Sequence, residues 1–157
     1  MDVNFVNPVI ASLLNVLSTM AHLEPTYGSP KIKDRNDVVH GKSLTGLMSM
    51  VGKQATASIA LTFTEAAILH IARKMLPGEF HKIDGVVIDL AGELANMALG
   101  GAKADFEKEG FLFQLSLPTI IVGADYLIAH RTKAPIIMLP FSMPEGDFFV
   151  EVSYEKT

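Results

Sequence analysis

The sequence contains no cysteine, so disulfide bonds, thiolate catalysis and cysteine-based metal sites are all excluded. It also lacks the Gly-x-Ser-x-Gly turn that exposes the nucleophile of many serine hydrolases. Neither of the glycine-rich loops that commonly bind nucleotide phosphates, Gly-x-x-x-x-Gly-Lys-Ser/Thr and Gly-x-Gly-x-x-Gly, is present. The chain therefore carries none of the motifs by which these classes of enzyme are recognised.

Positive charge is also scarce. The chain has 13 lysines and arginines against 17 aspartates and glutamates, a net charge of −4. Its densest basic cluster, Lys31–Arg35, is interpreted as a solvated loop. Because a nucleic-acid-binding domain concentrates more cations than this on one face, we do not expect nucleic acid as a partner.

The histidines are too scattered to predict a metal site. No two of the five share a helix at His-x-x-x-His spacing, and none is paired with a glutamate on one helix. His70 falls within an apolar helical segment, so we expect it at the edge of the core. We therefore predict that the chain itself binds no metal ion or other cofactor.

No apolar run predicts a membrane span. The run from Val9 to Met20 is interrupted by Asn15 and is shorter than the roughly 20 apolar residues that a spanning helix needs. The later run over 86–102 contains carboxylates, which are costly in lipid. The chain begins Met-Asp-Val-Asn, without the positive segment of a secretion signal. A cytoplasmic protein with no membrane contact is the expectation.

Length and periodicity predict one domain over residues 1–157, because 157 residues of which 49% are hydrophobic can bury a sizeable core. The spacing of apolar residues predicts three helices. The first begins at the Asn-Pro pair of residues 7–8, with the asparagine as N-cap. The second begins at the capping-box sequence Thr62–Glu65. The third runs from Val86 and ends at Gly110.

Between and after these helices, alternating polar and apolar residues predict strands. Turns are expected at Gly123–Asp125 and Met143–Asp147. Helices packed on a mainly antiparallel sheet make an α+β fold, a two-layer sandwich. The predicted strands are 37–52, 56–62, 111–115, 119–123, 126–131, 135–141 and 148–154.

The helix from Val86 has an unusual distribution of polar residues. At about 100° per residue, Asp89, Glu93 and Asn96 fall within a strip roughly 60° wide. Gly100 and Lys103 lie on or beside this strip and Gly92 lies just outside it, whereas nearly all other positions are apolar. Such a helix must be mostly buried, with a thin polar ridge left exposed. This ridge suits close approach by another macromolecule.

Other interpretations of these residues stay open on spacing alone. The ridge has the spacing of an ordinary solvated helix face. Asp89 also fits a first-turn carboxylate favoured by the helix dipole, and Lys103 fits a surface charge. A hydrolase that uses Asp89 and Glu93 as its two carboxylates is disfavoured, because at i and i+4 both lie on one convex surface rather than across a cleft.

The segment Asp89-Leu-Ala-Gly-Glu93-Leu-Ala-Asn96-Met-Ala-Leu-Gly-Gly-Ala-Lys103 resembles the signature helix of the CheC, CheX and FliY chemotaxis phosphatases. The pattern of that family is Asp, three residues, Glu, two residues, Asn. Flanking segments are similar to CheX in particular, so the resemblance covers nearly the whole chain and implies a CheC/CheX-like fold. These segments are Leu23-Glu-Pro25, Gly28-Ser-Pro30 and Leu117-Pro-Thr-Ile-Ile-Val-Gly123.

The resemblance implies a phosphatase that removes the aspartyl phosphate of a CheY-like response regulator. Asn96 would hold the attacking water, and Glu93 would pair with an active-site lysine of the regulator. Asp89, Gly92, Gly100 and Lys103 would contact the partner. Mg²⁺ would belong to the regulator and not to this chain.

CheC-type members carry two copies of the signature helix. Here the first helix has only Ser12 and Asn15 at the corresponding positions and lacks the glutamate, which fits the single-site CheX type. CheX relatives form dimers, so a homodimer is expected. The alternative function is a non-catalytic module that binds a response regulator or a flagellar switch protein through the same ridge.

Overall fold

An antiparallel sheet lies at the centre of residues 5–157, the part of the chain that the computed structural model describes. Within this part the sheet has eight strands in the order β1-β7-β8-β4-β3-β5; β2 also pairs with β7, and β6 with β3. Residues 1–4, where the sequence shows no positive start to a secretion signal, lie outside the described part. The strands are β1 (Thr26–Tyr27), β2 (Lys31–Lys33), β3 (Val39–Val51), β4 (Ala55–Thr64), β5 (Gln114–Leu115), β6 (Thr119–Tyr126), β7 (Ile136–Met143) and β8 (Gly146–Lys156).

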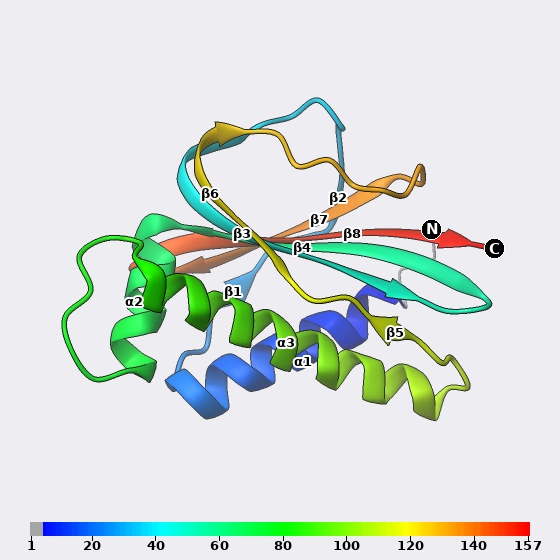
Figure 1. Cartoon of the computed structure of the whole chain (residues 1–157), viewed down its shortest axis with the longest axis horizontal. Helices are drawn as coiled ribbons and strands as arrows, with labels where there is room; N and C mark the ends of the chain where they lie inside the picture. The colour runs from blue at the N-terminus through cyan, green and yellow to red at the C-terminus, as the bar shows by residue number, and fades with distance from the viewer. Residues whose placement is uncertain (1–4) are drawn as a thin grey trace.

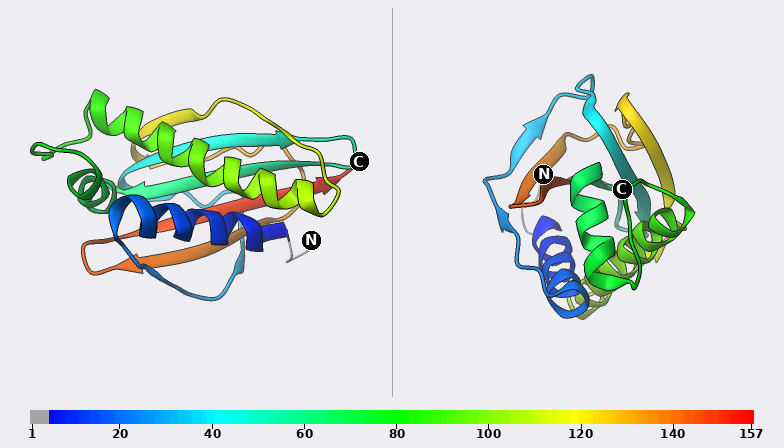
Figure 2. Two further views of the ribbon diagram at one scale, coloured as in Figure 1. Left: turned by 90° about the horizontal axis from the view of Figure 1, so that it is seen from below. Right: turned by 90° about the vertical axis from the view of Figure 1, so that its left-hand side faces the viewer.

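Three helices in the described part cover one face of this sheet: α1 (Val6–Ala21), α2 (Glu65–Met75) and α3 (Gly85–Lys108). Helices α1 and α3 lie side by side along that face, and the shorter α2 closes one end (Figures 1 and 2). No helix between residues 5 and 157 has the length and apolar character needed to cross a membrane. The predicted α+β arrangement, helices on a mainly antiparallel sheet, is confirmed.

The core lies between the helices and the sheet. Side chains from α1, α3 and strands β3, β4 and β8 are fully buried there, among them Leu13, Leu94, Leu44, Ile59 and Val152. Burying a large aliphatic side chain contributes about 1.5–3 kcal/mol. Since these residues recur at helical or strand periods, the same side chains that form the elements also dock them together.

Helix α3 approaches both its neighbours closely through small residues. A Cβ placed on Gly101 would lie 2.2 Å from the Oγ of Ser12 in α1, so only glycine fits there without a shift. A Cβ placed on Gly46 of β3 would lie 3.5 Å from the Cβ of Ala95. Gly100 differs, because nothing lies within 4 Å of the position its Cβ would take.

The second face of the sheet is covered by chain segments that arch over it (Figures 1 and 2). They comprise the stretch from β2 into β3 on one side and β6 with the segment after it on the other. Beneath them lies a layer of buried polar side chains. Its members on the strands and the arching segment are Ser43, Thr45, Ser58, Thr62, His130, Thr132, Glu151 and Ser153.

Two predicted helix starts are wrong by a few residues. Helix α1 begins at Val6, so Asn7 lies inside it and is not the N-cap. Helix α2 begins at Glu65, with the side chain of Thr64 accepting a hydrogen bond from the backbone N–H of Ala67. Thr62 belongs to β4 instead, where strand pairing prevails over the local capping sequence.

The hairpin predicted at Gly123–Asp125 is also wrong. Strand β6 continues through Gly123 as one strand, which pairs with β3 down to Val39, and no strand covers 127–131. Asp125 does have a turn-like positive φ of 53°, but its side chain accepts a hydrogen bond from the backbone N–H of Gly41 on β3. The turn predicted over Met143–Asp147 is confirmed between β7 and β8.

The remaining differences concern short segments. The basic cluster Lys31–Arg35 is exposed as predicted except at Lys33, whose side chain is buried, but Lys31–Lys33 forms β2 rather than a loop. Of the strand predicted over 111–115, only Gln114–Leu115 forms a strand, β5. His70 lies at the edge of the core as predicted, with its side chain 16% exposed.

The adjacent glycines in α3 should respond in opposite ways to substitution. Gly101→Leu should lower the free energy of unfolding by about 1–3 kcal/mol, because the new side chain would push α1 away from α3. Gly100→Ala should raise it by up to about 1 kcal/mol, because its Cβ meets open space and alanine favours helix. Urea denaturation of both variants would measure this, and equal stability of Gly101→Leu and wild type would contradict the close packing.

Candidate functional site

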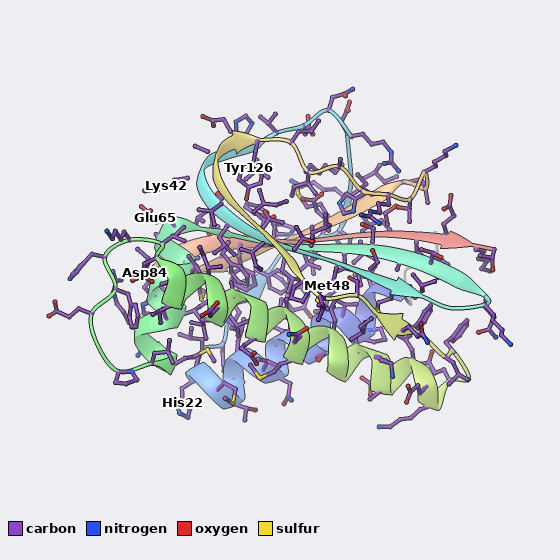
Figure 3. All side chains as sticks on the ribbon, in the orientation of Figure 1. His22, Lys42, Met48, Glu65, Asp84 and Tyr126 are labelled. Atoms are coloured by element: carbon purple, nitrogen blue, oxygen red, sulfur yellow. The ribbon has the colours of Figure 1, made fainter. Side chains whose placement is uncertain are left out.

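The polar ridge of α3 begins after a well-defined helix start. The side chain of Asp84, labelled in Figure 3 where α3 begins, accepts a hydrogen bond of 3.0 Å from the backbone N–H of Val87. The first helical residue is Gly85, and no acidic residue lies in the first turn. Asp89 therefore lies in the second turn, so its interpretation as a first-turn carboxylate favoured by the helix dipole is wrong; Asp84 occupies the N-cap.

Asp89, Glu93 and Asn96 are all exposed. We call these three residues the ridge. Gly92, Gly100 and Lys103, which the sequence placed on or beside it, are half-buried. The other sides of α3 are docked against the sheet and α1, and nine of its residues are buried: Val87, Leu90, Ala91, Leu94, Ala95, Ala98, Leu99, Ala102 and Phe106. The prediction of a mostly buried helix with a narrow exposed polar strip holds in part: Asp89, Glu93 and Asn96 are exposed, but so are Val86 and Gly101, and nine of the 24 residues are buried.

Glu93 forms no ion pair with any cation in residues 5–157. The nearest basic residue along the helix face, Lys103, instead pairs with Glu107 at 2.7 Å in an i,i+4 arrangement. The Glu93 carboxylate therefore remains available to a cation on another molecule.

The ridge is convex and borders neither of two hollows in the surface. A hollow of about 410 Å³ lies on the second face of the sheet, between β2, β3 and β8. Another of about 730 Å³ lies at the turn between β3 and β4. Neither hollow is lined by Asp89 or Glu93, and two carboxylates on one convex surface are poorly suited to hold a small substrate between them. It is suited to enter a pocket on another molecule.

One flank of the ridge is formed by the segment that connects β5 to β6, which runs alongside α3 (Figure 2). Pro118 is the contact residue: its Cγ lies 3.9 Å from the position of a Cβ on Gly92. Helical spacing makes Asn96 the next residue, i+4, on the same side of the helix as Gly92. In the sequence, this segment contributes only to the family resemblance, and no local pattern predicts its position beside α3.

The first helix offers no second ridge. Ser12 faces α3, where its hydroxyl occupies the space beside Gly101, while Asn15 is exposed. Ser12 and Asn15 would correspond to Glu93 and Asn96 in a second signature helix. Ser12 is used in a helix–helix contact, however, and only Asn15 faces solvent.

A second polar cluster, which the sequence analysis missed, lies under the arches on the opposite face of the sheet. The Lys33 ammonium is 3.1 Å from one oxygen of Glu151, and the Nε2 of His130 is 3.1 Å from the other. The Nδ1 of His130 is 2.7 Å from the Ser58 hydroxyl. Burial by itself raises the pKa of Glu151, but its hydrogen bonds and charge interactions with His130 and Lys33 outweigh this and lower the pKa overall. Being buried and internally paired, the cluster stabilises the fold.

A hydroxyl chain lies beside this cluster. The Thr45 hydroxyl is 2.8 Å from that of Thr62 and 2.6 Å from the Tyr126 hydroxyl. Burial raises the pKa of Tyr126, so it stays neutral and able to donate. The spacing of these residues along their strands is the only sequence signal for this layer, and it is equally typical of residues that face solvent.

Between residues 5 and 157, no three carboxylate or histidine side chains converge in a way that could hold a metal ion. The ridge carries two carboxylates, Asp89 and Glu93, on one convex surface. The donor set that Mg²⁺ prefers, several converging oxygens, is not formed by these residues.

Comparison with known proteins gives a consistent family. Residues 44–142 match the family model described as "Chemotaxis phosphatase CheX". The CheY-P phosphatase CheX of Thermotoga maritima is 27% identical over 158 residues, and the match spans 99% of this chain and 99% of that protein.

Solved structures agree with this match. The chemotaxis protein CheX from Vibrio vulnificus has a TM-score of 0.89 and 39% identity, over 97% of this chain and 99% of that one. A chain of the CheX-CheY-BeF3-Mg²⁺ complex from Borrelia burgdorferi has a TM-score of 0.79 and 21% identity, over 98% of this chain and 99% of that one. At that identity the likeness shows a shared fold. The expected CheX-like fold is confirmed.

The buried cluster predicts a specific acid sensitivity. Glu151→Gln should lower the free energy of unfolding at neutral pH by on the order of 3 kcal/mol, because Lys33 would keep a buried charge without its counter-charge. The ordinary pKa of the carboxyl is 4.5, and the folded chain lowers it. The stabilisation is therefore present above about pH 4.5 in the wild type and is lost as the pH falls through the folded pKa.

Urea denaturation across this pH range should show a shallower loss of stability in Glu151→Gln than in the wild type. Asp105→Asn is the matched control, because its ion pair with Lys108 is exposed and contributes less than about 1 kcal/mol. Parallel pH profiles for Glu151→Gln and wild type would disprove the assignment.

Proposed function

We propose, because the chain belongs to the chemotaxis phosphatase CheX family, that it hydrolyses the aspartyl phosphate of a CheY-like response regulator. The relative from Thermotoga maritima is a CheY-P phosphatase, and the Borrelia burgdorferi CheX forms a complex with CheY, BeF3 and Mg²⁺. The proposal transfers this activity to the present chain as a single CheX-like domain over residues 1–157 acting in the cytoplasm.

The observation that carries the proposal is the exposure of Glu93 and Asn96 on a convex, rigidly docked helix. A phosphorylated aspartate in a receiver domain must be reached from outside, so its phosphatase needs groups that project from its surface. Two side chains one helical turn apart, with buried residues behind them, meet this requirement. A catalytic group recessed in a cavity of this chain would not meet it.

In the proposed reaction, Asn96 positions the attacking water. Its side-chain amide has both a donor and an acceptor, so it can hold a water molecule in one orientation. The water oxygen forms a bond to phosphorus as the bond to the aspartyl oxygen breaks; the aspartate leaves as a carboxylate and the water's proton goes to the phosphate. Because an acyl phosphate is already activated, positioning can supply much of the acceleration.

Glu93 has a different part in the proposal. Its carboxylate, free of ion pairs within the described chain, would pair with the active-site lysine of the regulator and set the depth to which Asn96 enters. The Mg²⁺ ion is assigned to the regulator, since the residues described here form no site for it.

Asp89, Gly92, Gly100 and Lys103 are proposed as contacts at the margin of the docked regulator. Asp89 is exposed on the same strip, and a side chain added at Gly100 would project into open space rather than into the core. Bulk at this position would therefore meet the partner first. The ammonium of Lys103 pairs with the carboxylate of Glu107, and we propose that this pair contacts the regulator.

Turnover distinguishes the proposed phosphatase from a module that only binds. A CheY-like regulator labelled with acetyl phosphate would be mixed with this protein at one-hundredth of the regulator concentration, after excess acetyl phosphate has been removed. A phosphatase should dephosphorylate the whole regulator pool. Loss of phosphate only when the two proteins are equimolar, or no loss at all, would favour the binding module.

Substitutions of Asn96 and of Glu93 should affect different steady-state constants. Asn96→Ala should lower kcat on the order of 10²-fold with little change in KM, because it removes a group that acts on the reacting water. Glu93→Ala should mainly raise KM, because it removes a charged docking contact. Asn15→Ala and Glu109→Gln, which change exposed residues away from the ridge, are the matched controls. Wild-type rates in both ridge variants would refute the residue assignment.

A homodimer is the proposed assembly. Strand β6 pairs with β3 on one side, and within residues 5–157 no strand pairs with its other edge; such an edge can extend a sheet into a second copy. Size-exclusion chromatography with light scattering at micromolar concentration should give twice the 17.0 kDa mass of the chain. A single species at the monomer mass would refute the dimer.

A further inference from the structure

We propose that Leu117 is an apolar anchor that fixes the regulator against the ridge by contacting the surface that borders the phosphorylated aspartate. This rests on the proposed function, because the occupant is the same regulator. Leu117 is 86% exposed, although leucine is commonly among the buried residues of a globular protein. The backbone beside it is fixed by two hydrogen bonds between Ser116 and Ser49 of β3.

The chain is paired with β3 both before and after Leu117. Leu115 is paired with Met50, and Thr119 with Leu47. The chain advances by four residues from Leu115 to Thr119, whereas β3 covers the same distance in three residues, from Met50 to Leu47. One residue of the segment is therefore left over, as in a β-bulge. The chain is therefore forced outward between two fixed points.

Ser116 closes this bulge. Its backbone N–H donates to the carbonyl of Ser49 at 2.9 Å, and its side-chain oxygen accepts from the backbone N–H of Ser49 at 2.9 Å. Pro118 follows Leu117 and restricts it to an extended backbone, while its missing N–H is tolerated at a bulge. Leu117 is thus presented on a preorganised backbone, which loses little conformational entropy on binding.

The position of this bulge relative to the ridge identifies its partner. The Cγ of Pro118 lies 3.9 Å from the position of a Cβ on Gly92, the residue before Glu93 and one helical turn before Asn96. Leu117 is therefore placed beside the ridge, where a protein that brings its phosphorylated aspartate to Asn96 can contact it. The dimer proposed above pairs along β6, which begins at Thr119, after Leu117. We therefore assign the regulator, and not a second copy, to Leu117.

The chemistry of the two contacts is complementary. The ridge offers a carboxylate and an amide, which define the depth and direction of approach but cost desolvation when buried. Leu117 offers apolar area without that cost, and the removal of apolar area from water favours protein–protein association. The anchor should therefore control binding of the regulator and leave the chemical step unchanged.

Leu117→Ala tests the anchor. Its KM for the phosphorylated regulator should rise about tenfold, the value expected from losing apolar burial of a leucine, while kcat stays within twofold of wild type. The dissociation constant for the same regulator activated with beryllofluoride should rise by the same factor. Leu112→Ala is the matched control: Leu112 is 72% exposed but precedes β5, where its carbonyl lies close to Gly52 by the β3–β4 turn.

Two outcomes overturn the anchor while the proposed function stands: unchanged KM and dissociation constant in Leu117→Ala, or the same change in Leu112→Ala. If the unchanged regulator affinity of Leu117→Ala is accompanied by conversion of a dimer to a monomer, Leu117 contacts a second copy instead. If the wild type binds but does not turn over the regulator, the phosphatase proposal fails and the beryllofluoride measurement alone decides the anchor.

Discussion

The burial of α3 between the sheet and α1 is the constraint on which the rest of the structure depends. Ala95 meets Gly46 of β3, and Gly101 meets Ser12 of α1, so the helix packs closely against both neighbours. Because interiors are close-packed, a helix held in this way cannot rotate without opening cavities. The residues left outside, Glu93 and Asn96 among them, are therefore presented in a fixed direction.

Helical periodicity was sufficient to predict this helix and its exposed strip, because a period of 3.6 residues is a property of the local chain. Strand pairing is not local. Gly123-Ala-Asp125 has the composition of a turn, yet the chain runs through it as β6, because pairing with β3 supplies a ladder of hydrogen bonds that a hairpin there would lose. Thr62 likewise stays in β4, and the next threonine caps the helix.

The polar layer on the second face shows a limit of a different kind. Alternating polar residues in β4 and β8 are typical of a face open to water, and nothing in their spacing predicts that Glu151 and Ser58 are buried. Burial comes from residues far away in the sequence, Lys33 on β2 and His130 after β6, which arrive with hydrogen bonds already matched to them. A buried charge requires such partners. Sequence reasoning about one strand at a time cannot find them.

A convex site changes where catalytic control resides. An enzyme with a cleft shapes the environment of its own groups, whereas a ridge that enters another protein acquires its environment from that protein. Asn96 does not titrate, so in the proposed reaction the group that positions the water contributes no pH dependence of its own. What this chain can set by itself is geometry: the direction of the ridge through the packing of α3, and the lateral position of the partner through the rigid bulge at Leu117. Selection on such a protein should therefore act on residues that fix position, including small ones such as Gly101, as strongly as on Glu93 and Asn96, the two residues proposed to act on the regulator.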